Sequence, residues 1–281
     1  MHGVPSMLWE FRDLFIELRD GPAAGWGGDV LQPWLEMRPH LVEELRELGR
    51  PDSRRVRVPR GGNHYTVLEG LYALSRVLDV LVSAFQPDNP DPQLLDWTSG
   101  KPWWRGTIPS TSAWPDFCAA IGAVSLAESS FHPFFHEIVS VQVSDDADEP
   151  PSVVGECWPG AIVGGMLVAR AGVVIRAGAR HMNIDVAARS ALYWAWWRRN
   201  RRAVDLSHGW GHNSQWATDF RRDYVDEGQL HYNIDADPSR QPDSDLSDAD
   251  RIDLLRYRCS IRTDLGTDRW PFDDTFVEQA P

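Results

Sequence analysis

Cysteine is scarce in this chain of 281 residues. The three cysteines, Cys118, Cys157 and Cys259, lie far apart, which excludes a framework of paired disulfides and a zinc knuckle of closely spaced thiolates. We expect each to be a small buried residue rather than a nucleophile. So few cysteines fit a reducing compartment, and we therefore expect a cytoplasmic protein.

Lysine is scarcer still, because Lys101 is the only one. Subtracting it from the 28 basic residues leaves 27 arginines, a bias that we attribute to the base composition of the genome. The net charge of −13 opposes attraction to a nucleic-acid backbone, since such binding depends on a basic surface. Nucleic acid is therefore excluded as the expected partner.

Long apolar runs are absent as well. The longest stretch, residues 161–175, is interrupted by Arg170, and none approaches the roughly 20 residues that a bilayer crossing requires. The N-terminus does not show the basic start, apolar middle and small-residue cleavage site of an export signal. We expect neither a membrane protein nor an exported one.

Several familiar catalytic signatures are also missing. The sequence contains no Walker phosphate loop, no dinucleotide fingerprint and no Gly-x-Ser-x-Gly elbow. Its function must therefore be sought in residues that match no known spacing.

Apolar side chains recur at helical spacing in three stretches of the first 90 residues, which are predicted to be mainly helical. The stretches cover residues 8–18, 41–48 and 71–85, and each ends close to a glycine or a proline. Thr66 and Glu69 have the spacing of a capping box at the start of the third helix.

Residues 91–131 are rich in Trp, Pro, Asp and Ser and show no sustained period, which predicts an irregular segment. We expect its tryptophans, such as Trp103 and Trp104, to anchor the segment by burial, with stacking on a planar ligand as the alternative. A short helix is predicted within it at Phe117 to Ala127.

Residues 132–281 are predicted to mix strands with helix and to carry the functional site. Alternating valines predict a strand at residues 139–143, and further strand material follows at 153–157. A hairpin is predicted at 166–176, a helix at 183–202 and a strand at 255–261. The whole chain is predicted to form one α+β unit, with a helical N-terminal portion packed on a mainly antiparallel C-terminal sheet.

The densest gathering of reactive side chains runs from Ser207 to Trp216. His208 and His212 flank a glycine-rich turn and are predicted to bind a divalent metal such as zinc, with histidines bonded to loop carbonyls as the alternative. Trp210 and Asn213 are expected to contact a substrate.

Downstream, Asp226-Glu227-Gly228 is predicted to be a three-residue hairpin turn with positive φ at the glycine. With that turn, Asp223 faces His231 and Arg221 faces Asn233 on one polar surface. Asp223 would then orient His231 as a catalytic acid/base, and Arg221 with Asn233 would hold an anionic group. The alternative is a solvated face with ordinary cross-strand ion pairs.

A second histidine pair, His132 and His136 beside Glu137, lies where a strand is expected to begin. If it approached the first cluster in space, the combined histidines would suffice for one or two metal ions.

The leading hypothesis is a cytoplasmic enzyme that acts on a small anionic substrate, by hydrolysis and with help from a metal ion. The alternative is a protein without catalytic activity that binds or neutralises a protein partner through acidic and tryptophan-rich surfaces. Tryptophans on a flat exposed face would favour this alternative, whereas a concave pocket lined by His208, His212 and His231 would favour catalysis.

Overall fold

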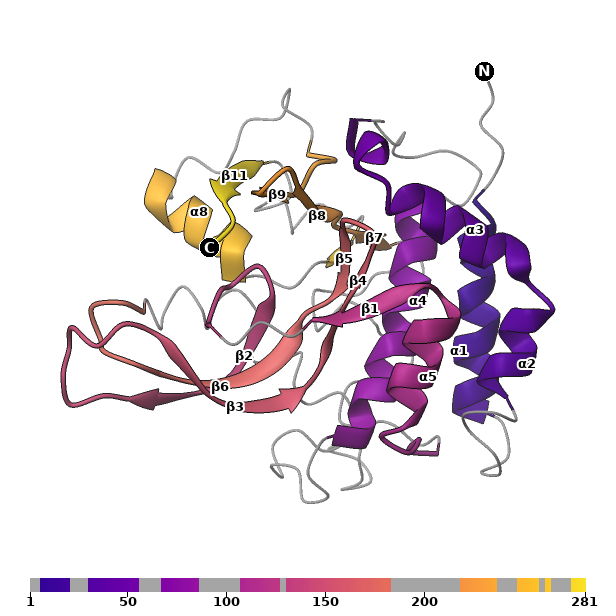
Figure 1. Ribbon diagram of the computed structural model, residues 1–281, viewed down its shortest axis with the longest axis horizontal. Helices are drawn as coiled ribbons and strands as arrows, with labels where there is room; N and C mark the ends of the chain where they lie inside the picture. The colour runs from indigo at the N-terminus through magenta and orange to yellow at the C-terminus, as the bar shows by residue number, and fades with distance from the viewer. Residues whose placement is uncertain are drawn as a thin grey trace.

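The computed structural model describes most of the chain, namely residues 6–20, 30–55, 67–85, 107–126, 130–182, 218–236, 247–257, 261–263 and 274–281. Most helices gather on one side of the molecule, whereas helix α8 lies with the strands on the other (Figure 1). The α-helices are α1 (Phe11–Asp20), α2 (Leu31–Glu36), α3 (Pro39–Leu48), α4 (Val67–Val82), α5 (Ala113–Ala120) and α8 (Asp248–Tyr257), and the 3-10 helices are η1 (Met7–Glu10), η2 (Pro51–Arg55) and η3 (Ser83–Phe85).

The helices α1, α3 and α4 confirm the three amphipathic stretches that the sequence predicts. Helix α3 begins with Pro39 in its first turn and ends at the cap residue Gly49, whose N–H donates to the carbonyl of Leu45. Helix α4 is buried around most of its circumference because α1, α5 and strands all pack on it.

The strands form three sheets. The strands are β1 (Ala123–Leu126), β2 (His136–Val143), β3 (Ser152–Trp158), β4 (Gly160–Val163), β5 (Met166–Ala169), β6 (Ala171–Ala177), β7 (Thr218–Phe220), β8 (Asp223–Asp226), β9 (Gln229–Tyr232), β10 (Ile261–Thr263) and β11 (Phe276–Gln279). The largest sheet has the order β1-β4-β5-β8-β9-β11 and is antiparallel throughout. A second sheet, β2-β6-β3, contains the parallel pair β2–β6, and β10 pairs with β7. The predicted α+β fold is confirmed.

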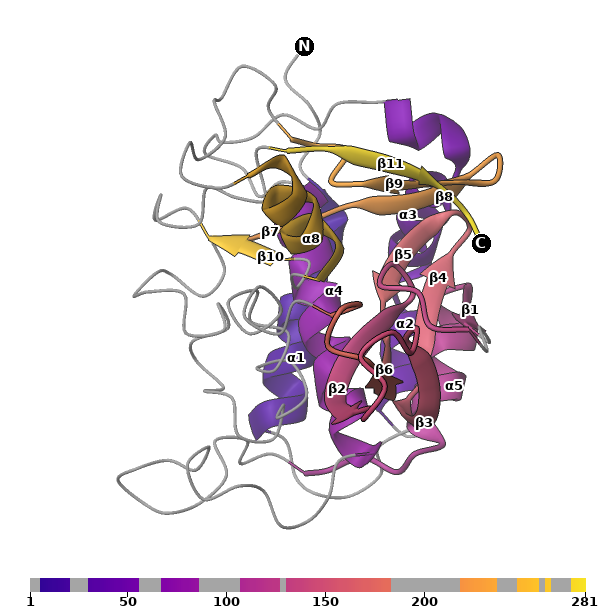
Figure 2. The same cartoon turned by 90° about the vertical axis from the view of Figure 1, so that its left-hand side faces the viewer.

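The predicted hairpin at residues 166–176 is wrong. Strand β5 belongs to the six-stranded sheet, whereas β6 belongs to the three-stranded sheet, so the chain changes sheets at Arg170 (Figure 2). Gly172 permits the change because a side chain at that position would collide with the ring of Trp158, which lies against it. The absent side chain therefore marks close packing rather than a turn.

Two other predicted elements differ from the structure. The helix expected at Phe117–Ala127 ends at Ala120, and β1 begins three residues later, after Gly122 adopts a φ of 75°. Of the strand expected at residues 255–261, residues 255–257 belong to helix α8, residues 258–260 lie outside the described residues and residue 261 begins β10. The hydroxyl of Ser247 accepts a hydrogen bond from the N–H of Asp250, at 3.2 Å, and this cap starts the helix.

The central strands of the six-stranded sheet are buried on both faces, whereas its edge strands β1 and β11 expose Val124 and Val277. Met166 and Tyr224 pack into the core shared with the helices, whereas their neighbours Leu167 and Leu230 pack with Phe134 in a separate cluster. Within the described residues, none of the helices is long and apolar enough to cross a membrane.

Candidate functional site

The β8–β9 hairpin exists, but its turn has two residues instead of the predicted three. Asp226 pairs with Gln229, and the turn residues Glu227 and Gly228 have φ values of 50° and 75°. Positive φ at both central residues is the geometry of a type I′ turn, whose twist matches that of the strands. The prediction failed because it allowed only the glycine a left-handed conformation.

The shorter turn shifts the register by one residue, so the predicted Asp223–His231 dyad is wrong. Tyr224 lies opposite His231. Residues directly opposite each other share a face of the sheet, and successive residues alternate between faces. Asp223 and His231 therefore project from opposite faces, and one cannot orient the other.

Asp223 instead lies at the centre of a buried ion network that also contains Arg170 and Arg221. Its Oδ2 accepts from Nη2 of Arg221 at 2.8 Å, from Nε of Arg221 at 3.2 Å and from Nη2 of Arg170 at 3.2 Å. Its Oδ1 accepts from the backbone N–H of Asn233 at 2.8 Å. This carboxylate, 1% exposed, is thus fully engaged by donors of the protein itself.

Arg170 reaches Asp223 because it occupies the corner between β5 and β6. Its Nε donates to the carbonyl of Phe134 at 3.0 Å. Burial lowers the pKa of Arg170 and the neighbouring Arg221 adds to this, while Asp223 and Glu137 oppose it. Arginine remains protonated regardless. The positive charges of Arg170 and Arg221 are therefore balanced by the carboxylates of Asp223 and Glu137. The network needs no bound ligand to be neutral.

The structure brings the predicted anion-binding pair, Arg221 and Asn233, to Asp223. Asn233 has a φ of 52°, ends β9 and donates through Nδ2 to the carbonyl of Asp274 at 2.8 Å. One nitrogen of Arg221, Nη1, has no hydrogen-bond partner within the described residues. The contacts shown for both side chains are structural, and anion binding by this pair stays a prediction.

His231 lies on the other face, close to Asp226 and Arg54, which form an ion pair with each other. Burial lowers the pKa of His231, the charge of Arg54 adds to this, and Asp226 opposes it. The ring is therefore neutral at pH 7. Its Nε2 is buried and makes no hydrogen bond to the described residues.

His132 and His136 are engaged with the backbone at the start of β2. Nδ1 of His132 accepts from the N–H of Phe134 at 3.2 Å, and Nδ1 of His136 lies 3.0 Å from the backbone N and O of His132. Burial lowers the pKa of His132, and the carboxylate of Glu278 partly opposes this shift. These rings shape the strand entry, and the described residues include no group of three His, Cys, Asp or Glu side chains placed to hold a metal ion.

Four predicted site residues lie outside the described residues: His208, Trp210, His212 and Asn213. Trp103 and Trp104 lie outside them too, whereas Trp114 is a buried residue of α5. The proposed metal and substrate contacts in the 207–216 segment therefore stay predictions.

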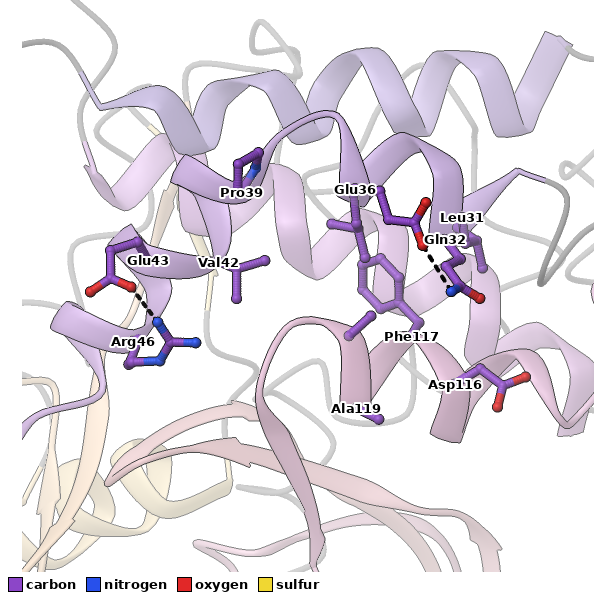
Figure 3. Close-up of a pocket in the computed structure, with 12 residues that line it drawn as sticks. Leu31, Gln32, Glu36, Pro39, Val42, Glu43, Arg46, Asp116, Phe117 and Ala119 are labelled. Atoms are coloured by element: carbon purple, nitrogen blue, oxygen red, sulfur yellow. Dashed lines mark hydrogen bonds and ion pairs between the residues drawn. The ribbon is translucent and has the colours of Figure 1, made fainter.

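The described residues also form a groove that the sequence did not reveal. It lies between α2 and α3 on one side and α5 on the other, with a volume of about 700 Å³ (Figure 3). The residues that line it are Leu31, Gln32, Leu35, Glu36, Pro39, Val42, Glu43, Arg46, Asp116, Phe117, Ala119 and Ala120. In the sequence, the groove was indicated only by Val42, an apolar residue next to Leu41 and Leu45, which form the buried stripe of α3.

The groove, defined by those twelve residues, has an apolar floor and a polar rim. Val42 and Ala119 line its interior together with Leu35 and Phe117, which are buried side chains of the core. Charged side chains stand at its edges (Figure 3). On the rim, Glu43 forms an ion pair with Arg46, and Oε1 of Glu36 accepts from Nε2 of Gln32 at 2.9 Å. The rim therefore carries more negative than positive charge.

Comparison of this chain with protein-family models, with curated proteins and with solved structures finds no match. The function of the protein is therefore inferred from its geometry alone.

Proposed function

We propose that the protein acts by binding another protein. This is the second of the two hypotheses that the sequence suggests. The observation that carries this proposal is the groove between α2, α3 and α5, open to solvent and lined by apolar side chains. Protein interfaces combine an apolar centre with a polar rim, and exposed apolar surfaces bordered by polar residues mark interaction sites. The absence of a bilayer-spanning helix in the described residues and the few cysteines support action in the cytoplasm.

Catalysis by the described hairpin has less support than binding through the groove. The buried carboxylate of Asp223 accepts hydrogen bonds from Arg170, Arg221 and the backbone of Asn233, so it is engaged within the protein rather than open to a substrate. Buried charges that are paired and hydrogen-bonded serve the fold. The lining of the groove, in contrast, includes apolar side chains that are not fully buried in the core, such as Val42 and Ala119.

Capture of a partner tests the proposal. The protein is used as bait beside two variants that place an arginine on an exposed alanine: Ala119→Arg in the groove, and Ala179→Arg in the turn after β6 as the matched control. The proposal is supported if the wild type and the control retain a partner that Ala119→Arg loses. A partner retained by all three would show that another surface binds it, and no specific partner at all would contradict protein binding.

A second candidate is an enzyme acting on a small anionic substrate. It is favoured by Nε2 of His231, which makes no hydrogen bond to the described residues. A neutral imidazole can accept a proton, and Arg54 beside it would attract an anion. A cavity of about 460 Å³ reaches Asp226, the ion-pair partner of Arg54. In this proposal His231 is the acid/base of a hydrolysis, with a zinc ion on His208 and His212 and with substrate contacts from Trp210 and Asn213.

Metal content and turnover test this second candidate. We would measure zinc in the purified protein and hydrolysis of a panel of phosphate and carboxylate esters, with His231→Gln and the double variant His208→Ala/His212→Ala. Loss of turnover in the first variant and of zinc in the second would support catalysis. A zinc-free wild type that hydrolyses none of the esters would contradict it.

A further inference from the structure

We infer that the groove binds an amphipathic helix of the partner, with lysine or arginine residues on both sides of its apolar face. This inference rests on the proposed function, because it names the class of partner for the same groove. Three observations on the described residues carry it: the shape of the groove, the position of its polar groups and the sign of its charge.

The shape suits a helix because two helical walls enclose an apolar trough. Val42 of α3 and Phe117 of α5 lie on opposite sides of it (Figure 3), and its lining also includes Leu35 of α2, which like Phe117 is buried. The wall formed by α5 ends in Ala119 and Ala120, whose small side chains leave room for a close approach. An amphipathic helix fills such a trough with side chains at positions i, i+3, i+4 and i+7.

The polar groups distinguish this groove from a pocket for a small molecule. A small ligand is oriented by a few polar groups that converge inside an apolar cavity. Here Glu36, Glu43, Arg46 and Asp116 stand at the two ends and the edges, and only apolar side chains occupy the middle (Figure 3). A ligand that is apolar along its centre and charged at its flanks matches this distribution.

The sign of the charge selects a basic partner. Arg46 is neutralised by Glu43, Glu36 is hydrogen-bonded to the uncharged Gln32, and Asp116 makes no ion pair within the described residues. Two rim carboxylates are thus available to cations of a partner. The net charge of −13 adds a long-range attraction that steers a basic molecule toward the protein.

Binding of labelled peptides to the full chain, followed by fluorescence anisotropy, tests the inference. The probe is a helical peptide of about 18 residues, five turns, with leucines at i, i+3, i+4 and i+7 and with lysines beside them. In a second peptide the lysines are replaced by glutamates. A third peptide has the same composition as the first but a scrambled order of residues. We expect the first peptide to bind at least about tenfold more tightly than either of the others.

A matched pair of variants tests whether the groove is responsible. Glu36→Gln/Asp116→Asn removes the two rim carboxylates, and Asp145→Asn/Asp248→Asn removes the same charge from exposed positions outside the groove. We expect the first pair to weaken binding of the cationic peptide by about tenfold at low salt and the second by less than about twofold. Ala119→Arg should abolish binding.

Equal binding of the ordered and scrambled cationic peptides, or equal loss in the two double variants, would show non-specific attraction and overturn the inference. Absence of binding by the ordered cationic peptide would overturn it too. If the partner capture described above still depends on Ala119 in those cases, the proposed function stands and only the helical, basic partner is wrong. If capture fails as well, both are wrong.

Discussion

Arg221 holds Asp223, two positions further along the chain, with two of its nitrogens: Nη2 lies 2.8 Å and Nε 3.2 Å from the same carboxylate oxygen. Arg170, which comes from the corner between two sheets, contacts that oxygen as well. This network therefore ties the six-stranded sheet to the turn that leads into the three-stranded sheet, and it serves the stability of the fold.

Replacement of Asp223 by alanine should be severely destabilising. It would leave the guanidinium groups of Arg170 and Arg221 buried without their carboxylate, and breaking a buried pair costs about 3–5 kcal/mol. Urea denaturation measures the loss. Asp248→Ala is the control, because Asp248 forms an exposed ion pair with Arg251 and its loss should cost about 1 kcal/mol or less. Equal losses in the two variants would contradict a structural role for the network.

Two glycines with positive φ should respond differently to alanine. Gly164 and Gly228 have φ values of 58° and 75°, so alanine is strained by about 1 kcal/mol at each. A side chain at Gly164 would also collide with the carbonyl of Gly49, whereas Gly228 has open space around it. The free energy of unfolding should therefore fall clearly further for Gly164→Ala than for Gly228→Ala. Similar losses would show that Gly49 and Gly164 do not pack this closely.

The lowered pKa of His231 predicts a loss of stability in mild acid. Burial keeps its ring neutral in the folded state, whereas the unfolded chain binds a proton near the ordinary histidine pKa of about 6.5. The unfolded state therefore holds more protons just below that pH, and the contribution of His231 is complete above about pH 6.5 and declines as the pH falls.

An NMR titration of the histidine rings checks this directly. The His231 signal should have its midpoint below about 6.5, with the urea-unfolded chain as the reference. His231→Gln should also reduce the decline of the unfolding free energy between about pH 6.5 and 5. A midpoint at or above the unfolded value would contradict the burial of this ring.

The helical part of the fold was predictable because its signals are local. The stripes of α1, α3 and α4 repeat at helical spacing and end at glycine or proline, so the sequence alone locates them. Helix α8 was missed because its start depends on one hydrogen bond from Asp250 to the side chain of Ser247, while the alternation after Leu255 resembled a strand.

The candidate site was harder to predict because it depends on long-range contacts. The hairpin follows from Gly228, but its register depends on whether Glu227 accepts a positive φ, and one residue of difference reverses every side chain. The alternation rule also assumes one solvated face, whereas the central strands of this sheet are buried on both. Arg222, for example, is buried and pairs with Asp235 through two bonds of 2.7 Å.

The groove could not be located from the sequence, because α5, which forms one of its walls, lies far along the chain from α2 and α3. Its lining combines Leu35, Val42 and Phe117, each of which reads in the sequence as an ordinary apolar residue of a helix. Only the packing of the helices shows that Leu35 and Phe117 are buried in the core whereas Val42 remains partly exposed.

Photo-crosslinking in living cells tests the central claim, protein binding through the groove, most directly. A photoreactive amino acid would replace Val42 in the groove or, as the control, Val154, an exposed apolar residue of β3 that lies outside it. We expect a discrete protein adduct from position 42 and no adduct of that size from position 154. The adduct from position 42 should be lost when the Ala119→Arg substitution is introduced into the same chain. No adduct from position 42, or the same adduct from both positions, would contradict it.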